Sequence, residues 1–185
     1  MKEPLDVLVV GELNVDLLLY GIGQPPELGK EILADRMTLT MGSSSAIFAA
    51  NLAALGSRTG FIGRLGKDVF GDLVRESLEA AGVQTGGLMV REEEVTGATV
   101  VLGWGGDRAM VTHKGAMDHL AAEDVSDERL AGARHLHVSS FFLQEGLRPG
   151  CAALFARAKR LGLSTSFDPQ WDPEERWEGL SLIHI

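Results

Sequence analysis

The chain has 185 residues, 45% hydrophobic content and a mean hydropathy of +0.07, which is enough apolar material for one folded domain. Its net charge of −9 argues against nucleic acid or an anionic membrane surface as a partner. No apolar run approaches the length that crosses a bilayer, and the N-terminus lacks the apolar core of a signal peptide. The single cysteine, Cys151, falls among apolar residues of a predicted helix and can form no internal disulfide. These features predict a cytoplasmic protein with no membrane or nucleic-acid partner.

The first element is a continuous apolar run, Leu5 to Val10, which predicts a strand buried on both faces, as in a parallel sheet. Asn14 and Asp16 follow just beyond its end. Ligands of open α/β sheets gather at the carboxyl ends of strands, and side chains spaced i, i+2 on extended backbone point to the same side. The two residues are therefore candidate ligand-binding groups. Asp and Asn are also common as plain turn formers, and the sequence alone leaves both interpretations open.

Two pairs of predicted strands have the alternating pattern of a half-exposed sheet. The first pair lies within about residues 15–40, with its second strand over 32–41, and the second pair lies within about residues 96–113. The turn Gly105-Gly106-Asp107 marks the second pair as a hairpin. We expect these pairs to leave the main sheet and to form a small sheet, a lid, over its strand ends.

Gly42 and three serines precede an alanine-rich run that ends at Gly56. This pattern predicts a helix with Ser43, Ser44 or Ser45 as its N-cap and Gly56 as its stop. Small residues before a helix start, together with the unpaired N–H groups there, let a ligand approach the backbone. An ordinary flexible loop before a capped helix is the alternative.

The rest of the chain alternates between strands and helices. The predicted elements are a strand over 59–62, a helix capped by Asp68 and stopped by Gly82, a strand over 83–90, a helical turn near 122–130, a strand over 134–139, a helix over 151–161 and a strand over 163–167. This order predicts right-handed crossovers and a mostly parallel sheet with helices on its faces.

Several motifs of common enzyme classes are absent. The chain has no Walker loop, no GxGxxG after the first strand, and no HExxH, CxxC or GxSxG. His135 and His137 share one face of a strand, but no further ligand follows at a zinc spacing, so we predict no metal site. Polar groups remain at strand ends and helix starts, and their types suit a hydroxyl-bearing ligand. They are Asn14, Asp16, the Gly42–Ser45 turn, Gln144, Asp168 and Gln170.

Six segments together make the chain similar to a known family. They are Gly11-Glu-Leu-Asn14-Val-Asp16, the glycine-serine turn with its alanine-rich helix, Gly63-Arg-Leu-Gly66-Lys-Asp68-Val-Phe-Gly71, Leu78-Glu-Ala-Ala-Gly82-Val83, Thr96-Gly-Ala, and Phe167-Asp-Pro-Gln-Trp-Asp-Pro. On these segments the chain, through Trp177, resembles the PfkB (ribokinase-like) carbohydrate kinases. The resemblance implies a ribokinase-like α/β fold, with a mostly parallel sheet flanked by helices and a small β lid. It also implies transfer of the γ-phosphoryl group of ATP, with Mg²⁺, to a hydroxyl of a sugar or nucleoside.

The resemblance also implies roles for single residues. Asn14 and Asp16 would hold sugar hydroxyls, and Gly42, Ser43 and Ser44 would approach the same ligand.

Further along the chain, Gln144 is expected to be a substrate-binding residue, and Asp168 and Gln170 are expected near the transferred phosphate. Ile47 departs from the family pattern, which has an asparagine there, and Ser43 stands where the family has a second glycine. These departures bear on the identity of the substrate rather than on the fold.

The family's catalytic aspartate lies in a Gly-Ala-Gly-Asp-like motif near its C-terminus. Neither that motif nor the magnesium-proximal Asn-x-x-Glu segment occurs in this sequence. We therefore expect residues 1–179 to be the N-terminal part of a kinase, with the substrate half and the lid. That part would carry no catalytic residue, no metal ligand and little of the nucleotide pocket, and would have little or no activity alone. Residues 180–185 read like a translated sequencing adaptor and are expected to lie outside the fold.

Two other functions fit parts of the sequence. A non-catalytic sugar-binding or regulatory protein on the same scaffold is the main alternative. A nucleotide-dependent oxidoreductase is disfavoured because the first βα turn lacks its fingerprint. Lid sheets of this type sometimes pair between subunits, so a homodimer of the intact protein is a further hypothesis.

Overall fold

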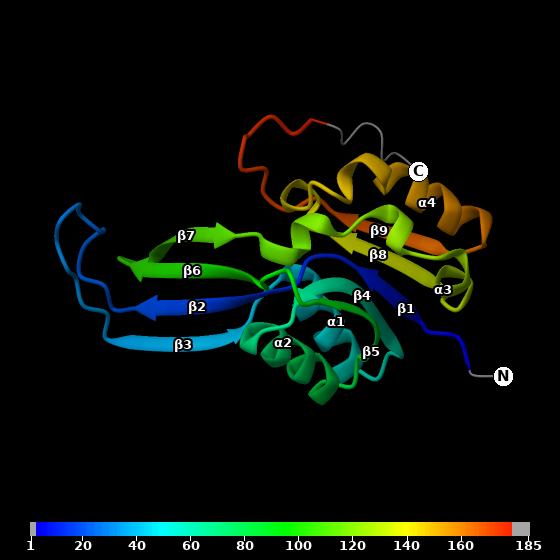
Figure 1. The fold of residues 1–185 in the computed structure, drawn as a ribbon, viewed down its shortest axis with the longest axis horizontal. Coiled ribbons are helices and arrows are strands. Elements are labelled where there is room, and N and C mark those ends of the chain that lie inside the picture. Colours follow the sequence, from blue (N-terminus) through cyan, green and yellow to red (C-terminus); the bar gives the residue numbers. More distant parts are fainter. Residues whose placement is uncertain (1–2, 179–185) are drawn as a thin grey trace.

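The computed structural model describes residues 3–178, which form two separate sheets with helices around the larger one (Figure 1). The larger sheet has the strand order β5-β4-β1-β8-β9, and all of its neighbouring strands are parallel. Its strands are β1 (Val7–Val10), β4 (Thr59–Gly66), β5 (Gln84–Arg91), β8 (His135–Ser139) and β9 (Ser164–Asp168). The predicted mostly parallel α/β fold is therefore confirmed.

Helices cover both faces of this sheet. Figure 1 shows the first two on one side and the last two on the other. They are α1 (Ser44–Ala54), α2 (Val69–Ala80), α3 (Asp127–Ala131) and α4 (Cys151–Arg160). Short 3-10 turns lie in the connections: η1 (Gly115–His119), η2 (Ala122–Asp124), η3 (Phe141–Leu143) and η4 (Arg148–Gly150).

The main sheet separates the apolar interior into two cores, and β1 contributes side chains to both. Val9 belongs to the core beneath α1 and α2, while Leu8 and Val10 belong to the core that also contains Leu154 and Phe155 of α4. Successive side chains of a strand point to opposite faces, so a strand that serves both cores must be apolar at every position. This requirement explains the unbroken apolar run in the sequence.

The second sheet, which we call the lid, extends away from the main body (Figure 1). It has the order β3-β2-β6-β7, and its strands are β2 (Asn14–Tyr20), β3 (Arg36–Met41), β6 (Gly97–Trp104) and β7 (Asp107–His113). The central pair, β2 and β6, is parallel, and the two outer pairs are antiparallel. The β6–β7 turn has positive φ at Gly105 and Gly106, as a tight two-residue hairpin turn requires.

Some element boundaries differ from the sequence-based prediction. β3 begins at Arg36 rather than at residue 32, because residues 21–35 form a long connection that contains two adjacent prolines. β4 continues to Gly66 rather than ending at residue 62, because its second half pairs with β5. The helical turn expected near 122–130 is split into η2 and α3, with Ser126 as the cap of the helix.

Other local predictions hold. Of the three serines considered, Ser43 is the N-cap of α1, and its Oγ accepts a hydrogen bond from Ala46 N at 3.0 Å. Asp68 caps α2 as predicted, and Gly56 and Gly82 follow the two helix ends with positive φ. Cys151 is completely buried, and this burial raises the pKa of its thiol to about 12.

Within residues 3–178, no helix is both long and apolar enough to cross a bilayer. The tail predicted at 180–185 lies outside the described residues.

Candidate functional site

A cavity of about 760 Å³ lies between the lid and the segments that follow β1, β8 and β9. Its volume is within the range of ordinary small-molecule sites. The residues that line it are Glu12, Asn14, Asp16, Ser43, Ser44, Thr99, Val101, Met110, Thr112, Lys114, Met117, Ser140, Phe142, Leu143, Glu145, Arg148, Gln170, Trp171, Asp172, Pro173 and Glu174. The strand ends of the main sheet therefore supply one wall, and the lid supplies the opposite wall.

Five of the predicted site residues line this cavity: Asn14, Asp16, Ser43, Ser44 and Gln170. They come from three separate segments of the chain, which the fold brings together at one edge of the main sheet. Their roles toward a ligand stay predictions.

Three predicted site residues are not part of the lining, although each contacts a residue that is. A side chain at Gly42 would clash with the Asp16 carboxylate, so this glycine allows the close approach of the two segments. Asp168 accepts hydrogen bonds from Gln170, at 3.0 Å from its backbone N and 2.6 Å from its Nε2.

Gln144 is completely buried rather than open to the cavity. Its Nε2 donates hydrogen bonds to the carbonyl oxygens of Ser139, at 2.7 Å, and Ser140, at 3.3 Å. It therefore supports the turn that carries Ser140 to the cavity wall.

A row of polar side chains lies at the base of the lid. Asn14 Nδ2 donates to Asp16 Oδ1 at 3.2 Å and to Thr99 Oγ1 at 2.9 Å, and Thr99 Oγ1 lies 3.0 Å from Thr112 Oγ1. Burial raises the pKa of the Asp16 carboxyl, although the hydrogen bond from Asn14 acts in the opposite direction. Carboxylate, amide and hydroxyl groups in one row offer both donors and acceptors, which is what a polyol needs.

In the cavity wall formed by the main sheet, Glu12 is the centre of a hydrogen-bonded group of serines. Its carboxylate accepts hydrogen bonds from Ser44 Oγ at 2.8 Å, from Ser140 Oγ at 2.8 Å, and from both the backbone N, at 3.1 Å, and the Oγ of Ser45. The side chain is 2% exposed, so these donors replace the water that a buried carboxylate would otherwise need. This group fixes the start of α1 relative to the end of β8.

Strained backbone occurs repeatedly around the cavity. Ser43, Ser140 and Gln170 have φ values of 71°, 55° and 57°, in the left-handed region that favours glycine. Such conformations persist only where the surroundings enforce them, and they concentrate at functional sites. Three of them in one cavity wall support the assignment of this cavity as the functional site.

The comparison with protein families agrees with this geometry. The model of the pfkB family of carbohydrate kinases matches residues 4–183. The chain belongs to the pfkB family.

Two relatives of this pfkB chain illustrate the extent of the similarity. The ATP-dependent ribose-1-phosphate kinase of Halopiger xanaduensis is 33% identical over 165 residues, which are 88% of this chain and 53% of that protein. The solved structure of Arabidopsis thaliana ribokinase, complexed with ribose and ATP, has a TM-score of 0.76 at 26% identity and covers 90% of this chain and 54% of its own.

A ribokinase II structure from E. coli in complex with ATP and Mg²⁺ has a TM-score of 0.75 at 28% identity, and covers 91% of this chain and 54% of its own. The chain spans about half the length of the curated relatives it matches.

No metal-binding cluster of three or more His, Cys, Asp or Glu side chains occurs among residues 3–178. His135 and His137 share one strand face, and both contact the hydroxyl of Ser166, at 2.7 Å each. Burial lowers the pKa of His137 to about 4, so at neutral pH the ring is uncharged.

Sequence reasoning missed several residues that line this cavity. Glu12 lies within the segment Gly11–Asp16, but its function as a hydrogen-bond acceptor depends on serines from two distant segments. Arg148 lies in a short turn with no periodic pattern to mark it. Thr99 is one of many polar positions in an alternating strand, and only the strand register shows that it lies beside Asp16.

Proposed function

We propose that this chain is the acceptor-binding part of a carbohydrate kinase that transfers the γ-phosphoryl group of ATP to a hydroxyl of a sugar or nucleoside. One observation carries the proposal: Asn14, Asp16, Ser43 and Ser44 meet in a single cavity that the lid covers. The activities for which two relatives are named, a ribose-1-phosphate kinase and a ribokinase complexed with ribose and ATP, support it.

In this proposal the cavity residues bind and orient the acceptor. The Asp16 carboxylate accepts a hydrogen bond from a hydroxyl of the sugar or nucleoside. Asn14 holds this carboxylate in position, because its Nδ2 donates to both Asp16 and Thr99. The opposite wall, held by Glu12, offers the hydroxyl of Ser44 and the backbone of the Ser43 turn. Closure of the lid over the bound acceptor would exclude water, which would otherwise compete for the phosphoryl group.

ATP with Mg²⁺ would supply the phosphoryl group in the intact enzyme. The residues described here do not by themselves fit a magnesium ion, because they hold no cluster of three suitable side chains. The sequence also lacks the Gly-Ala-Gly-Asp-like motif in which the family carries its catalytic aspartate. We therefore propose that the 185-residue chain binds an acceptor without phosphorylating it.

The test combines a binding assay with a transfer assay. Calorimetric titration of the 185-residue chain with a panel of sugars and nucleosides should identify at least one ligand. Asp16→Asn should weaken its binding by about 10- to 100-fold, because the side chain loses its negative charge and half of its acceptor oxygens. Asp72→Asn, on the exposed surface of α2, is the matched control and should leave the affinity unchanged.

Three results would contradict parts of the proposal. Absence of binding to every sugar and nucleoside would remove the acceptor site. ADP release by the 185-residue chain would contradict its inactivity. A gene product, expressed from start to stop codon, that binds sugar but releases no ADP would favour the non-catalytic sugar-binding protein.

We also propose that the intact protein pairs with a second copy through the lid. The lid has two faces, and the face that does not carry the Asp16 side chain is apolar. Leu39 lies opposite Leu17, and Met37 lies opposite Leu19. Leu39, Met37 and Val111 are 41%, 70% and 66% exposed. A two-fold pairing would bury the same apolar face in both copies.

A further inference from the structure

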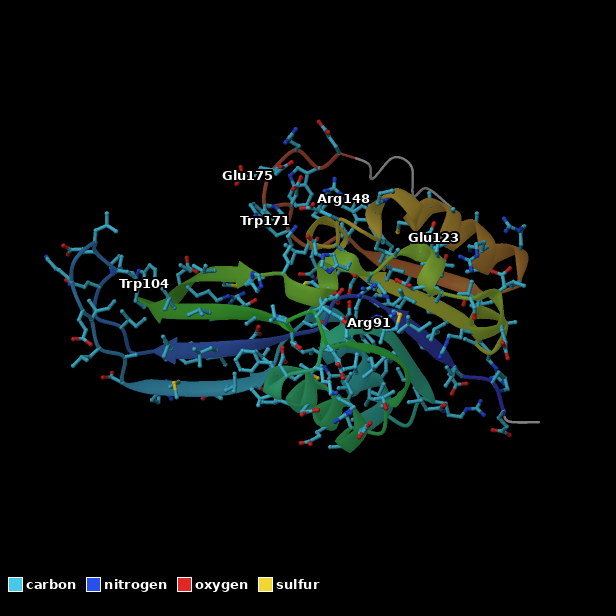
Figure 2. All side chains as sticks on the ribbon, viewed as in Figure 1. Arg91, Trp104, Glu123, Arg148, Trp171 and Glu175 are labelled. Carbon is cyan, nitrogen blue, oxygen red and sulfur yellow. The ribbon has the colours of Figure 1, made fainter. Side chains whose placement is uncertain are left out.

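Arg148 is a charged residue of the cavity wall that has no ionic partner. Its guanidinium lies over the rings of Phe141 and Phe142, with its central carbon 5.4 and 5.7 Å from the ring centroids. Among residues 3–178, this guanidinium takes part in no ion pair and no hydrogen bond. Figure 2 labels Arg148 near Trp171, on the segment after β9, and both residues line the cavity. A half-buried cation is thus held in position at the cavity wall without forming an ion pair within residues 3–178.

The acidic side chains near Arg148 are occupied by other partners. Glu145 pairs with Lys114, which also lies 3.1 Å from Asp118. Asp172 accepts hydrogen bonds from three backbone N–H groups of the loop that follows it, at 2.7 to 2.9 Å. Glu174 pairs with Arg176 at 2.6 Å. None of these carboxylates forms an ion pair with Arg148. Burial acts to raise the pKa of Asp172, but its backbone hydrogen bonds and the nearby charge of Arg148 lower it.

The two remaining acids of the lining are also hydrogen-bonded elsewhere. Glu12 is surrounded by serine donors, and Asp16 is bound by Asn14. The cavity wall therefore has one cation, Arg148, that forms no ion pair within residues 3–178, together with a row of hydroxyl-binding groups at the base of the lid.

We propose that Arg148 binds an anionic substituent, a phosphate or a carboxylate, on the acceptor sugar. The inference rests on the proposed function and specifies its acceptor class as a sugar phosphate or sugar acid. A guanidinium presents a planar fork of donors that matches the oxygens of either anion. Contact with the two phenylalanine rings limits the orientations of that fork, so less side-chain entropy is lost when the anion binds.

The charge of the chain makes this single cation decisive. The chain carries a net charge of −9, and five carboxylates line the cavity. An anionic ligand would be repelled from such a lining unless one position offers an unpaired positive group. Loss of Arg148 should therefore weaken the binding of anionic sugars and leave uncharged sugars almost unaffected.

The experiment compares matched ligands on the 185-residue chain by calorimetry. The ligand pairs are D-ribose 5-phosphate with D-ribose, and D-gluconate with D-glucose. We expect the anionic member of at least one pair to bind at least about tenfold more tightly than its uncharged partner. Arg148→Met should reduce the affinity for that anion by about 10- to 100-fold, with the uncharged partner changed by less than about twofold.

Two further variants distinguish a specific role from a structural one. Arg148→Lys keeps the charge and should recover part of the lost affinity. Arg75→Met removes an arginine from the outer surface of α2 and should behave like the unmodified chain. Circular dichroism on each variant shows whether the fold is retained, and Arg148→Lys provides the test if Arg148→Met unfolds.

The outcomes separate this inference from the proposed function. Uncharged sugars that bind as tightly as anionic ones would overturn the inference and leave the proposed function intact. The inference also fails if the preference for the anion persists in Arg148→Met. If Arg148→Met weakens the binding of ATP but not of the sugar phosphate or sugar acid, Arg148 serves the phosphoryl donor and the inference is wrong. If none of these four ligands binds but another uncharged sugar or a nucleoside does, the inference is wrong and the proposed function stands. If no sugar or nucleoside binds at all, both proposals fall.

Discussion

His137 shows how one buried side chain can make the stability of the fold depend on pH. It is 7% exposed, its ring stacks on Phe48 with the centroids 3.9 Å apart, and its Nδ1 lies 2.7 Å from Ser166 Oγ. Burial, with repulsion from His135 as a smaller cause, lowers its pKa from 6.5 to about 4. In the unfolded chain the ring would keep its ordinary pKa. The unfolded state therefore binds an additional proton between these two values, and folding is weakened as the pH falls.

We predict that the free energy of unfolding decreases by about 2 to 3 kcal/mol between pH 6.5 and pH 4 because of this residue. Urea unfolding at several pH values measures the slope. His137→Gln removes the titrating group and should flatten the profile in that range, whereas His113→Gln, on the exposed edge of the lid, should not. An unchanged slope in His137→Gln would show that other groups cause the acid sensitivity.

Single residues also show the limit of sequence reasoning. Asn14 and Asp16 were predicted as candidates because they are two positions apart on extended backbone and because ligands of α/β sheets bind at the ends of strands. Both arguments need only a short stretch of sequence. Glu12 and Arg148 were missed because their roles arise from partners that are present or absent in space. The carboxylate of Glu12 is matched by serines more than thirty residues away, and Arg148 is notable only because no carboxylate of the described residues forms an ion pair with it.

At the scale of elements, Asp68 connects the main sheet to the lid. Its Oδ1 accepts a hydrogen bond from Gly71 N at 2.8 Å and so caps α2, while its Oδ2 accepts one from Thr96 N at 2.7 Å, just before β6. Thr96 Oγ1 in turn accepts a hydrogen bond from Gly66 N, at the end of β4. Three elements therefore meet at this carboxylate. Burial alone would raise the pKa of Asp68, but the backbone donors outweigh it and lower the pKa.

We predict that Asp68→Ala lowers the free energy of unfolding by about 2 to 4 kcal/mol, because it removes a helix cap and leaves the buried Thr96 N–H without a partner. Hydrogen exchange should also become faster in β6 than in β8, since the lid loses its attachment. Ser126→Ala removes only the cap of α3 and should cost about 1 kcal/mol. Equal losses in the two variants would contradict the connecting role of Asp68.

Elements with a simple burial pattern were predicted well. The apolar run of β1 and the capped start of α2 depend on a short stretch of sequence and were found as expected. The boundaries of β3 and β4 were wrong because pairing partners decide where a strand ends. β4 continues through glycines and an arginine that have little strand preference, because the positions from Ile62 to Gly66 pair in continuous register with β5.

At the scale of the whole molecule, the apolar outer face of the lid leads to a prediction about assembly. If a second copy covers this face, a charged side chain in the middle of the face would be buried without a partner. Such burial is costly, so the two copies should separate. Leu39→Glu in the intact protein should therefore convert a dimer into a monomer, as measured by light scattering. Thr38→Glu, one position along the same strand, points to the other face and is the matched control. A monomer without any substitution would refute the proposed pairing.

The parallel pair at the centre of the lid has a consequence for synthesis on the ribosome. β2 must find β6, and their paired residues are roughly 80 positions apart in the chain. The hairpin is complete at Met41, and β6 ends at Trp104. At typical elongation rates of about 5 to 20 residues per second, the β2–β3 hairpin therefore waits about 3 to 13 seconds for its partner strand. During that interval its leucines and methionines are unprotected, so nascent chains of this protein should depend on chaperones most strongly before residue 104 has left the exit tunnel.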